Sequence, residues 1–162
     1  MPKLTVIDHI HVWVKDRAAS AAWYQRILGL IPEARFAAWA EKQEGPLTLS
    51  NSSNTVRIAL FEKLDAQASH AVIAFSVAGP DFLAWIDKLA GERVQAVDGR
   101  FLARDCIRDH KQAWSFYFVD PDGNPFEITS YDYSWLAAKL TAISSGWLAR
   151  RPACSRCCFI FS

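Results

Sequence analysis

The chain of 162 residues contains no apolar run of about 18 residues, so we expect no transmembrane helix. Its first residues, MPKLTVIDHI, lack the basic and then apolar pattern of a secretory signal peptide. The net charge is only +1, which gives no reason to expect nucleic acid or a membrane surface as a partner. The apolar fraction of 51% is nevertheless large enough to build a hydrophobic core.

Cysteine is scarce, since the chain has four and three of them, Cys154, Cys157 and Cys158, lie near the C-terminus. The rest of the chain therefore has no framework of disulfide pairs, which is typical of a reducing compartment. We expect a cytoplasmic protein. The C-x-x-C-C spacing could grip zinc, but a structural zinc site needs four ligands and no partner pair is evident. We assign no chemistry to these cysteines.

Acidic residues are missing from residues 133–162, which hold four of the 18 basic residues and none of the 17 acidic ones. This change in composition separates an extension from the body of the chain. We expect a helix at SWLAAKLTAI, followed by a basic, cysteine-containing segment packed on the body or disordered.

The first part of the body reads as one strand, one helix and three further strands. Asp16 is placed to cap the helix RAASAAWYQRIL, and Gly29 is placed to end it. Glycine, proline and asparagine mark the turns between the later strands. The strands are expected over residues 4–14, 34–40, 47–50 and 55–61.

The same order of elements then returns. A helix is expected to begin near Gly79 and Pro80, and DPDGN is a strong turn signal between the last two strands. The strands are expected over residues 70–77, 93–97, 114–119 and 126–131. The repeat predicts two βαβββ modules, which we place at residues 1–63 and 64–132.

The stretch IDHIHVWV raises the question of function, because it places two histidines in an apolar strand. Side chains alternate between the two faces of a strand. One face carries Ile10, Val12 and Val14 and is expected to face the core. His9, His11 and Trp13 share the opposite face, which is expected to line a cavity or to be half exposed.

Three segments together resemble the vicinal oxygen chelate superfamily, namely DHIHVWVKDRAASAAWYQRILGL, SHAVIAFSV and SFYFVDPDGNPFEI. This superfamily includes glyoxalase I, extradiol dioxygenases, fosfomycin-resistance thiol transferases and bleomycin-resistance proteins. The resemblance implies an α+β fold in which two βαβββ modules pair mixed sheets into a cup-like cavity. It also implies a homodimer and a small-molecule substrate.

The resemblance implies a divalent metal ion held by His9, His70 and Glu127. The alternation of apolar residues agrees, since each candidate lies on the non-core face of its strand. Two imidazoles and a carboxylate suit iron or manganese, and zinc or nickel remain open. The ion would polarise a substrate that binds through two oxygens. Each site could be built within one chain or shared between two.

Two further residues, His11 and Arg57, each allow more than one role. His11 could replace His9 as a ligand, support the site by hydrogen bonding, or act as an acid or base. Arg57 falls near the position where glyoxalase-type sites carry another acidic ligand. An arginine cannot ligate a metal, so it would bind an anionic group of the substrate or remain an ordinary surface residue.

Aromatic residues supply the remaining candidates. By resemblance to the dioxygenases, Tyr131 is a candidate catalytic residue and Tyr117 a candidate at the substrate. Trp13 and Trp114 are expected to line an aromatic-accepting cavity.

The reaction is the least determined feature of the sequence. Fosfomycin-resistance transferases carry a threonine where this chain has His11, and an arginine where it has Leu136. We therefore expect dioxygenase-like or lyase-like chemistry rather than fosfomycin-type thiol transfer. The alternative is a metal-free protein that sequesters a drug, as bleomycin-resistance proteins do.

Overall fold

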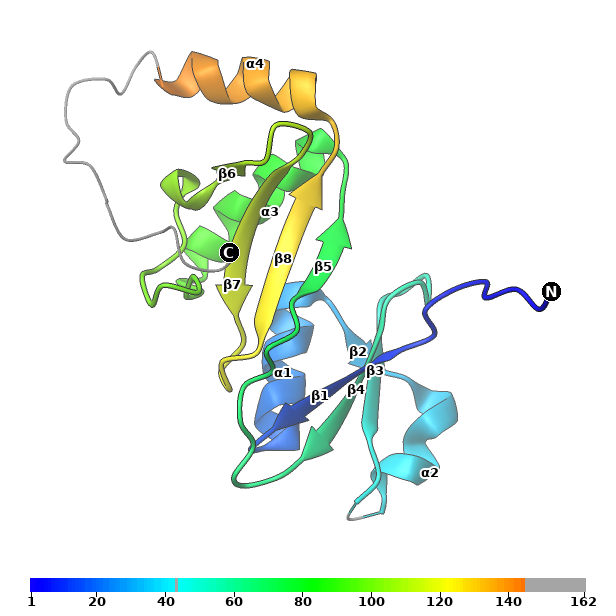
Figure 1. The fold of residues 1–162 in the computed structure, drawn as a ribbon. Helices are drawn as coiled ribbons and strands as arrows, with labels where there is room; N and C mark the ends of the chain where they lie inside the picture. Colours follow the sequence, from blue (N-terminus) through cyan, green and yellow to red (C-terminus); the bar gives the residue numbers. More distant parts are fainter. Residues whose placement is uncertain (43, 145–162) are drawn as a thin grey trace. The chain divides into compact units, whose positions relative to one another are not determined.

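The computed structural model describes residues 1–42 and 44–144, whose strands form two four-stranded sheets (Figure 1). The first sheet has the order β1-β4-β3-β2, with β1 parallel to β4 and the other pairs antiparallel. The second has the corresponding order β5-β8-β7-β6. The strands of the first sheet are β1 (Ile10–Val14), β2 (Ile31–Pro32), β3 (Leu47–Ser50) and β4 (Arg57–Glu62). Those of the second are β5 (Ile73–Ser76), β6 (Arg108–Asp109), β7 (Trp114–Val119) and β8 (Pro125–Ser130).

Each sheet carries a helix between its first and second strands, α1 (Arg17–Leu28) in one case and α3 (Gly79–Gly91) in the other. The repeated βαβββ order and the α+β fold are thereby confirmed. The predicted pairing of the sheets around a cavity, and the module boundaries at residues 63 and 132, stay predictions.

The chain forms two compact units that do not follow sequence order strictly. Unit 1 consists of Met1–Ile73 together with Val119–Phe126. Unit 2 consists of Ala74–Phe118 and Glu127–Ser162. The structure describes the first of these segments completely and the second as far as residue 144. The turn between β7 and β8 therefore packs with the first sheet and α1.

Helix α1 begins and ends as its sequence predicts. The Asp16 side chain accepts a hydrogen bond from the Ala19 amide at 2.9 Å, and Gly29 ends the helix in the left-handed conformation with φ 70°. Only glycine adopts this conformation without strain. The helix buries Tyr24 and Ile27 against the sheet side chains of unit 1.

The DPDGN turn is built around a buried carboxylate. Asp120 accepts hydrogen bonds from the backbone amides of Asp122 and Asn124 at 2.9 and 2.8 Å. Gly123 has φ 86°, which completes the turn. On the other side of the carboxylate, the Tyr24 hydroxyl donates to Asp120 at 2.7 Å, so the turn is fastened to α1 within unit 1.

The strand predicted over residues 34–40 is wrong. These residues form a short 3-10 helix, η1 (Ala34–Phe36), and one turn of helix, α2 (Ala37–Ala40). Alanine favours helix, and a helical turn brings Phe36 and Trp39 to one side, where their rings stack at 4.6 Å. The second strand of the unit in chain order is instead the short strand β2, which pairs with β3 at the edge of the sheet.

The strand predicted over residues 93–97 is also wrong, since it is reduced to isolated bridges at Gln95 and Ala96. Arg93 has φ 55° and Gly99 reverses the chain, so little extended backbone remains. A 3-10 turn, η2 (Arg104–Cys106), follows and leads into β6.

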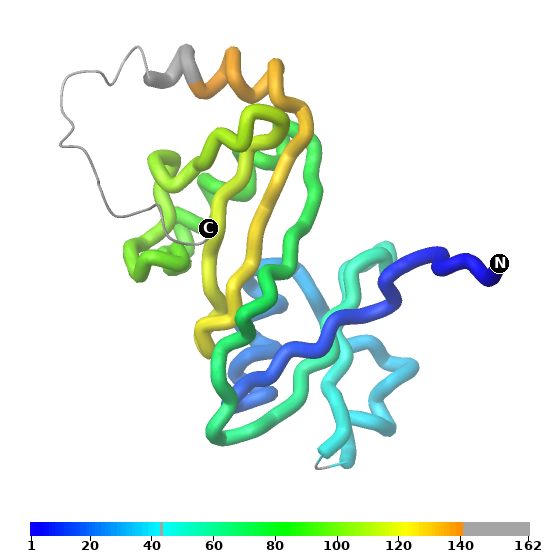
Figure 2. The backbone as a smooth tube through the Cα atoms, viewed as in Figure 1, coloured from blue at the N-terminus to red at the C-terminus, as the bar shows by residue number. Residues whose placement is uncertain are grey.

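The strand predicted at residues 4–14 is shorter than expected. Residues before β1 leave the sheet as an extended segment (Figure 2).

The expected helix of the extension is confirmed as α4 (Tyr133–Ser144). Its Leu136 side chain is buried. In the described part of the chain, no helix combines the length and hydropathy needed to cross a membrane. Cys154, Cys157 and Cys158 lie outside the described residues.

Candidate metal centre

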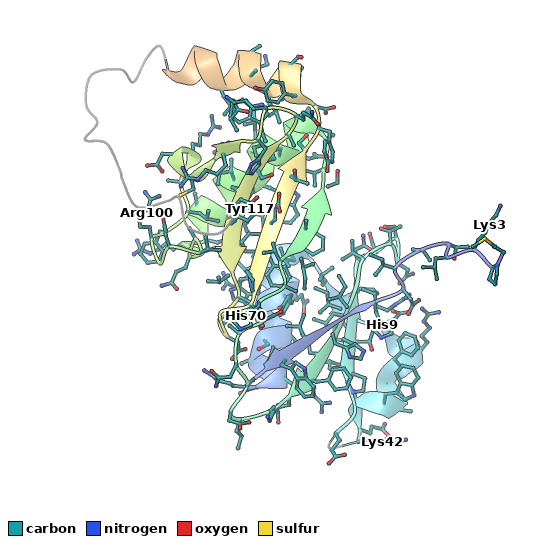
Figure 3. The ribbon with its side chains drawn as sticks, viewed as in Figure 1. Lys3, His9, Lys42, His70, Arg100 and Tyr117 are labelled. Atoms are coloured by element: carbon teal, nitrogen blue, oxygen red, sulfur yellow. The ribbon has the colours of Figure 1, made fainter. Side chains whose placement is uncertain are left out.

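His9 and His11 converge at the beginning of the first sheet. Strand β1 buries Val12 and Val14 and thus turns the alternate residues outward, as predicted. The two imidazole rings stack with 5.0 Å between centroids and an interplanar angle of 23°. Their Nε2 atoms are only 3.0 Å apart, and His9 is labelled in Figure 3 where the chain enters β1.

A carboxylate fixes the protonation pattern of this pair. Asp8 Oδ2 lies 2.7 Å from His9 Nδ1, and this hydrogen bond lowers the pKa of Asp8 below its usual value, with Arg57 contributing. Because an ionised carboxylate can only accept, His9 carries its proton on Nδ1. With that proton on Nδ1, a neutral His9 ring has its lone pair on Nε2, where it accepts the hydrogen bond from His11 Nε2–H.

Arg57 of β4 holds this carboxylate in place. Its guanidinium donates to Asp8 Oδ1 at 2.9 Å, to the Asp8 carbonyl at 3.2 Å and to Glu33 Oε2 at 2.7 Å. The bond from Arg57 also lowers the pKa of Glu33. The Arg57 side chain is only 8% exposed. This arrangement favours a supporting role for Arg57 over the predicted contact with an anionic substrate.

His70 lies in the bend that precedes β5 and is exposed. The residues on both sides of His70, Ser69 and Ala71, form hydrogen bonds. The Ser69 amide donates to the Asn124 side chain at 3.0 Å, and the Ser69 hydroxyl accepts from the Ala71 amide at 3.0 Å. The loop around His70 is thus anchored to the DPDGN turn within unit 1.

Glu127 lies on β8 in unit 2 and is half-buried beside Tyr117 of β7. Partial burial raises the pKa of Tyr117, and the negative charge of Glu127 raises it further. The structure also brings Nε2 of His110 to 3.1 Å from the Tyr117 hydroxyl. The strand pair β6–β7 makes this contact, and no local sequence signal could have found it. Figure 3 labels Tyr117.

The other aromatic candidates are dispersed. Trp13 is 47% exposed and packs on Phe61 with 5.2 Å between ring centroids. The Trp114 ring stacks on Tyr133 at 5.6 Å, and its indole N–H donates to the Tyr133 carbonyl at 3.2 Å. Tyr131 is 71% exposed at the edge of a hollow of about 520 Å³ in unit 2.

The described residues contain no group of three histidine, cysteine, aspartate or glutamate side chains assembled as a metal site. His9 and His70 belong to unit 1, whereas Glu127 belongs to unit 2. The structure thus brings together His9 with His11, and Glu127 with Tyr117. The set of His9, His70 and Glu127 stays a prediction.

Comparison with known families gives a match over most of the chain. The family model of the Glyoxalase/Bleomycin resistance protein/Dioxygenase superfamily matches residues 6–128. The metallothiol transferase FosB of Lysinibacillus sphaericus is 31% identical over 124 residues, which are 75% of this chain and 79% of the relative. FosB of Staphylococcus epidermidis is 30% identical over 128 residues, covering 78% of this chain and 82% of the relative.

Solved structures agree on the fold. A mutant of the fosfomycin resistance protein FosX of Listeria monocytogenes, in complex with Mn(II) and 1S,2S-dihydroxypropylphosphonic acid, has a TM-score of 0.62 and 17% identity. The similarity covers 82% of this chain and 96% of FosX. An integron cassette protein from the metagenome of a sewage outfall in Halifax Harbour has a TM-score of 0.59 and 20% identity, covering 78% and 99%. At these identities the likeness concerns the fold alone.

Proposed function

Because the chain belongs to the Glyoxalase/Bleomycin resistance protein/Dioxygenase superfamily, we propose that it is a metal-dependent enzyme that adds a thiol to a small oxygenated electrophile of the fosfomycin class. The observation that carries this proposal is the similarity to FosB metallothiol transferases over three quarters of the chain. That similarity favours thiol transfer over the dioxygenase-like or lyase-like reaction that the sequence alone suggested.

The proposed metal ligands are His9, His70 and Glu127. One contact supports this set: Asp8 occupies Nδ1 of His9, so Nε2 is the nitrogen of that ring that would coordinate an ion. Two imidazoles and one carboxylate suit a divalent first-row metal, and Mn(II) in a FosX structure agrees with that choice. When bound, such an ion supplies positive charge that polarises a substrate oxygen.

Unit 2 offers a proton donor for the reaction. Opening a three-membered epoxide by a thiol forms a C–S bond and breaks a C–O bond. The thiol gives up its proton to solvent, and the ring oxygen must receive one. Tyr117 is protonated at neutral pH, as a tyrosine of ordinary pKa already is, and its pKa is raised further. His110, bonded to the Tyr117 hydroxyl at 3.1 Å, can resupply the proton. We expect Tyr117→Phe to lower kcat while the metal is retained.

One departure from the fosfomycin-resistance transferases bears on the substrate. Leu136 replaces the arginine expected from the resemblance, and its side chain is fully buried in α4. It therefore supplies no positive charge for a phosphonate. We expect fosfomycin to bind more weakly than to the FosB relatives, and an uncharged epoxide to be the better substrate.

A homodimer is part of the proposal. Residues before β1 expose Leu4, Val6 and Ile7, and β1 lies at the edge of its sheet. An edge strand with apolar flanks is suited to pair with another chain.

The test is direct. Metal-free protein is reconstituted with Mn(II), Zn(II), Ni(II) or Co(II) and incubated with fosfomycin and a thiol, and product is followed by phosphorus NMR. Propylene oxide, followed by proton NMR, serves as the uncharged electrophile. Turnover that needs metal and is lost in Glu127→Ala supports the proposal. Consumption of oxygen with a catechol, or stoichiometric drug binding that ignores chelators, would refute it.

A further inference from the structure

The geometry of the first strand points to a second metal ligand: we propose that His11 coordinates the same divalent ion as His9, so that the two imidazoles form a bidentate clasp. The inference rests on the proposed metal site and deepens it. It uses only side chains of unit 1.

The separation of the two nitrogens is that of neighbouring ligands on one ion. At metal–nitrogen distances of about 2.0–2.1 Å, two ligands at octahedral or tetrahedral angles are about 2.9–3.4 Å apart. The Nε2 atoms of His9 and His11 are 3.0 Å apart. An ion bound to both would lie off the line that joins the two nitrogens, at about 2.0–2.1 Å from each.

The pair is held in this arrangement before any ion binds. Asp8 fixes the ring of His9 through Nδ1, and Arg57 holds Asp8 by its carboxylate and its carbonyl. The His11 ring packs on Phe61 with 4.6 Å between centroids. Strand β1 pairs with β4 along its length, with His11 opposite Ala59, which fixes the direction of the His11 ring. A preorganised pair loses little side-chain entropy on binding.

Coordination changes the protonation of only one ring. His9 already has a free Nε2 lone pair, whereas His11 must carry its proton on Nδ1 instead of Nε2. Metal binding thus exchanges the hydrogen bond between the rings for two metal–nitrogen bonds.

The additional nitrogen has a consequence for the choice of metal. With His70 and Glu127, the proposed site would hold three imidazoles and one carboxylate. Imidazole-rich sites prefer zinc, nickel or copper, whereas oxygen-rich sites suit manganese. The chain is therefore expected to favour Zn(II) or Ni(II) over Mn(II).

Four forms of the full chain test the clasp, namely wild type, His11→Gln, Glu127→Ala and the double variant. Each is stripped of metal and titrated with Zn(II) by calorimetry, and circular dichroism checks the fold. Lys15→Gln, on the same strand margin, is the matched control. We expect His11→Gln to weaken Zn(II) binding at least about tenfold. Glu127→Ala should keep a weak site that the second substitution removes.

The two proposals fail in different ways. Unchanged affinity in His11→Gln overturns the clasp, and loss in Glu127→Ala would still support the three-ligand site. Unchanged affinity in Glu127→Ala with loss in His11→Gln keeps the clasp and refutes Glu127. Affinity alone does not separate a ligand from a supporting residue, so nitrogen-15 spectra of labelled histidines complete the test. A Zn(II)-dependent shift of His11 Nε2 is expected, and no shift would overturn the proposal.

Discussion

The bond from Tyr24 to Asp120 allows a quantitative test of how unit 1 is fastened together. Tyr24→Phe removes one hydroxyl and keeps the ring, which packs edge-on against Trp23 and Phe126 at 5.2 and 5.9 Å. The side chain of Tyr24 is fully buried, and its hydroxyl donates to Asp120 Oδ2 at 2.7 Å. The substitution therefore isolates a single buried hydrogen bond to a carboxylate.

The expected loss follows from the charge of the acceptor. Hydrogen bonds to charged groups contribute about 1.5–3 kcal/mol to stability. After the change, Asp120 Oδ2 keeps the bond from the Asn124 amide group at 2.9 Å, so the lower half of that range applies. A loss of about 2 kcal/mol lowers the Tm of a chain of this size by about 4–8 °C.

The effect must also depend on pH in a defined direction. Burial raises the pKa of Asp120, while the bonds from Asn124 and Tyr24 oppose that rise. Removing the hydroxyl raises the folded-state pKa of Asp120 further, because the ionised form loses the bond. The difference in stability between wild type and Tyr24→Phe is therefore largest when the pH is above the folded-state pKa of Asp120 in both proteins. It becomes smaller as the pH falls through these two pKa values.

Thermal and urea unfolding at neutral and acidic pH measure both effects. Tyr133→Phe is the matched control, since its hydroxyl donates to the exposed carboxylate of Asp109 at 3.1 Å. We expect no measurable change in its Tm. Equal losses in the two variants, or a Tyr24→Phe effect that grows toward acid, would refute the reasoning.

Two further predictions concern packing and the metal. A Cβ at Gly79 would lie 2.7 Å from the Trp135 ring, so Gly79→Ala should lower the free energy of unfolding, measured in urea, by about 1–3 kcal/mol. A Cβ at Gly91 would meet open space, so Gly91→Ala should leave the free energy of unfolding unchanged or raise it slightly. His9→Ala and Glu127→Ala should each bind less metal by elemental analysis. Mixing the two variants tells whether sites are shared: recovery of about a quarter of the sites indicates a dimer with shared sites, and no recovery indicates sites within one chain.

Local signals in the sequence determined much of the fold. Asp16 and Gly29 set the ends of α1, and the DPDGN residues form the turn before β8. The alternation in β1 placed His11 and Trp13 on the outward face, since successive side chains of a strand point to opposite faces. The duplicated order of elements followed from the same signals, because each depends on only a few neighbouring residues.

Tertiary structure decided what depends on distant partners. Residues 34–40 form helical turns, and β2 is the strand that pairs with β3. Arg57 turned toward Asp8 and Glu33, because two carboxylates lie within reach of its guanidinium. His110 met Tyr117 only through the pairing of β6 with β7. Periodicity in a sequence indicates which face of a strand a side chain lies on. The residue that it contacts on that face is distant in the sequence, so only the tertiary structure identifies it.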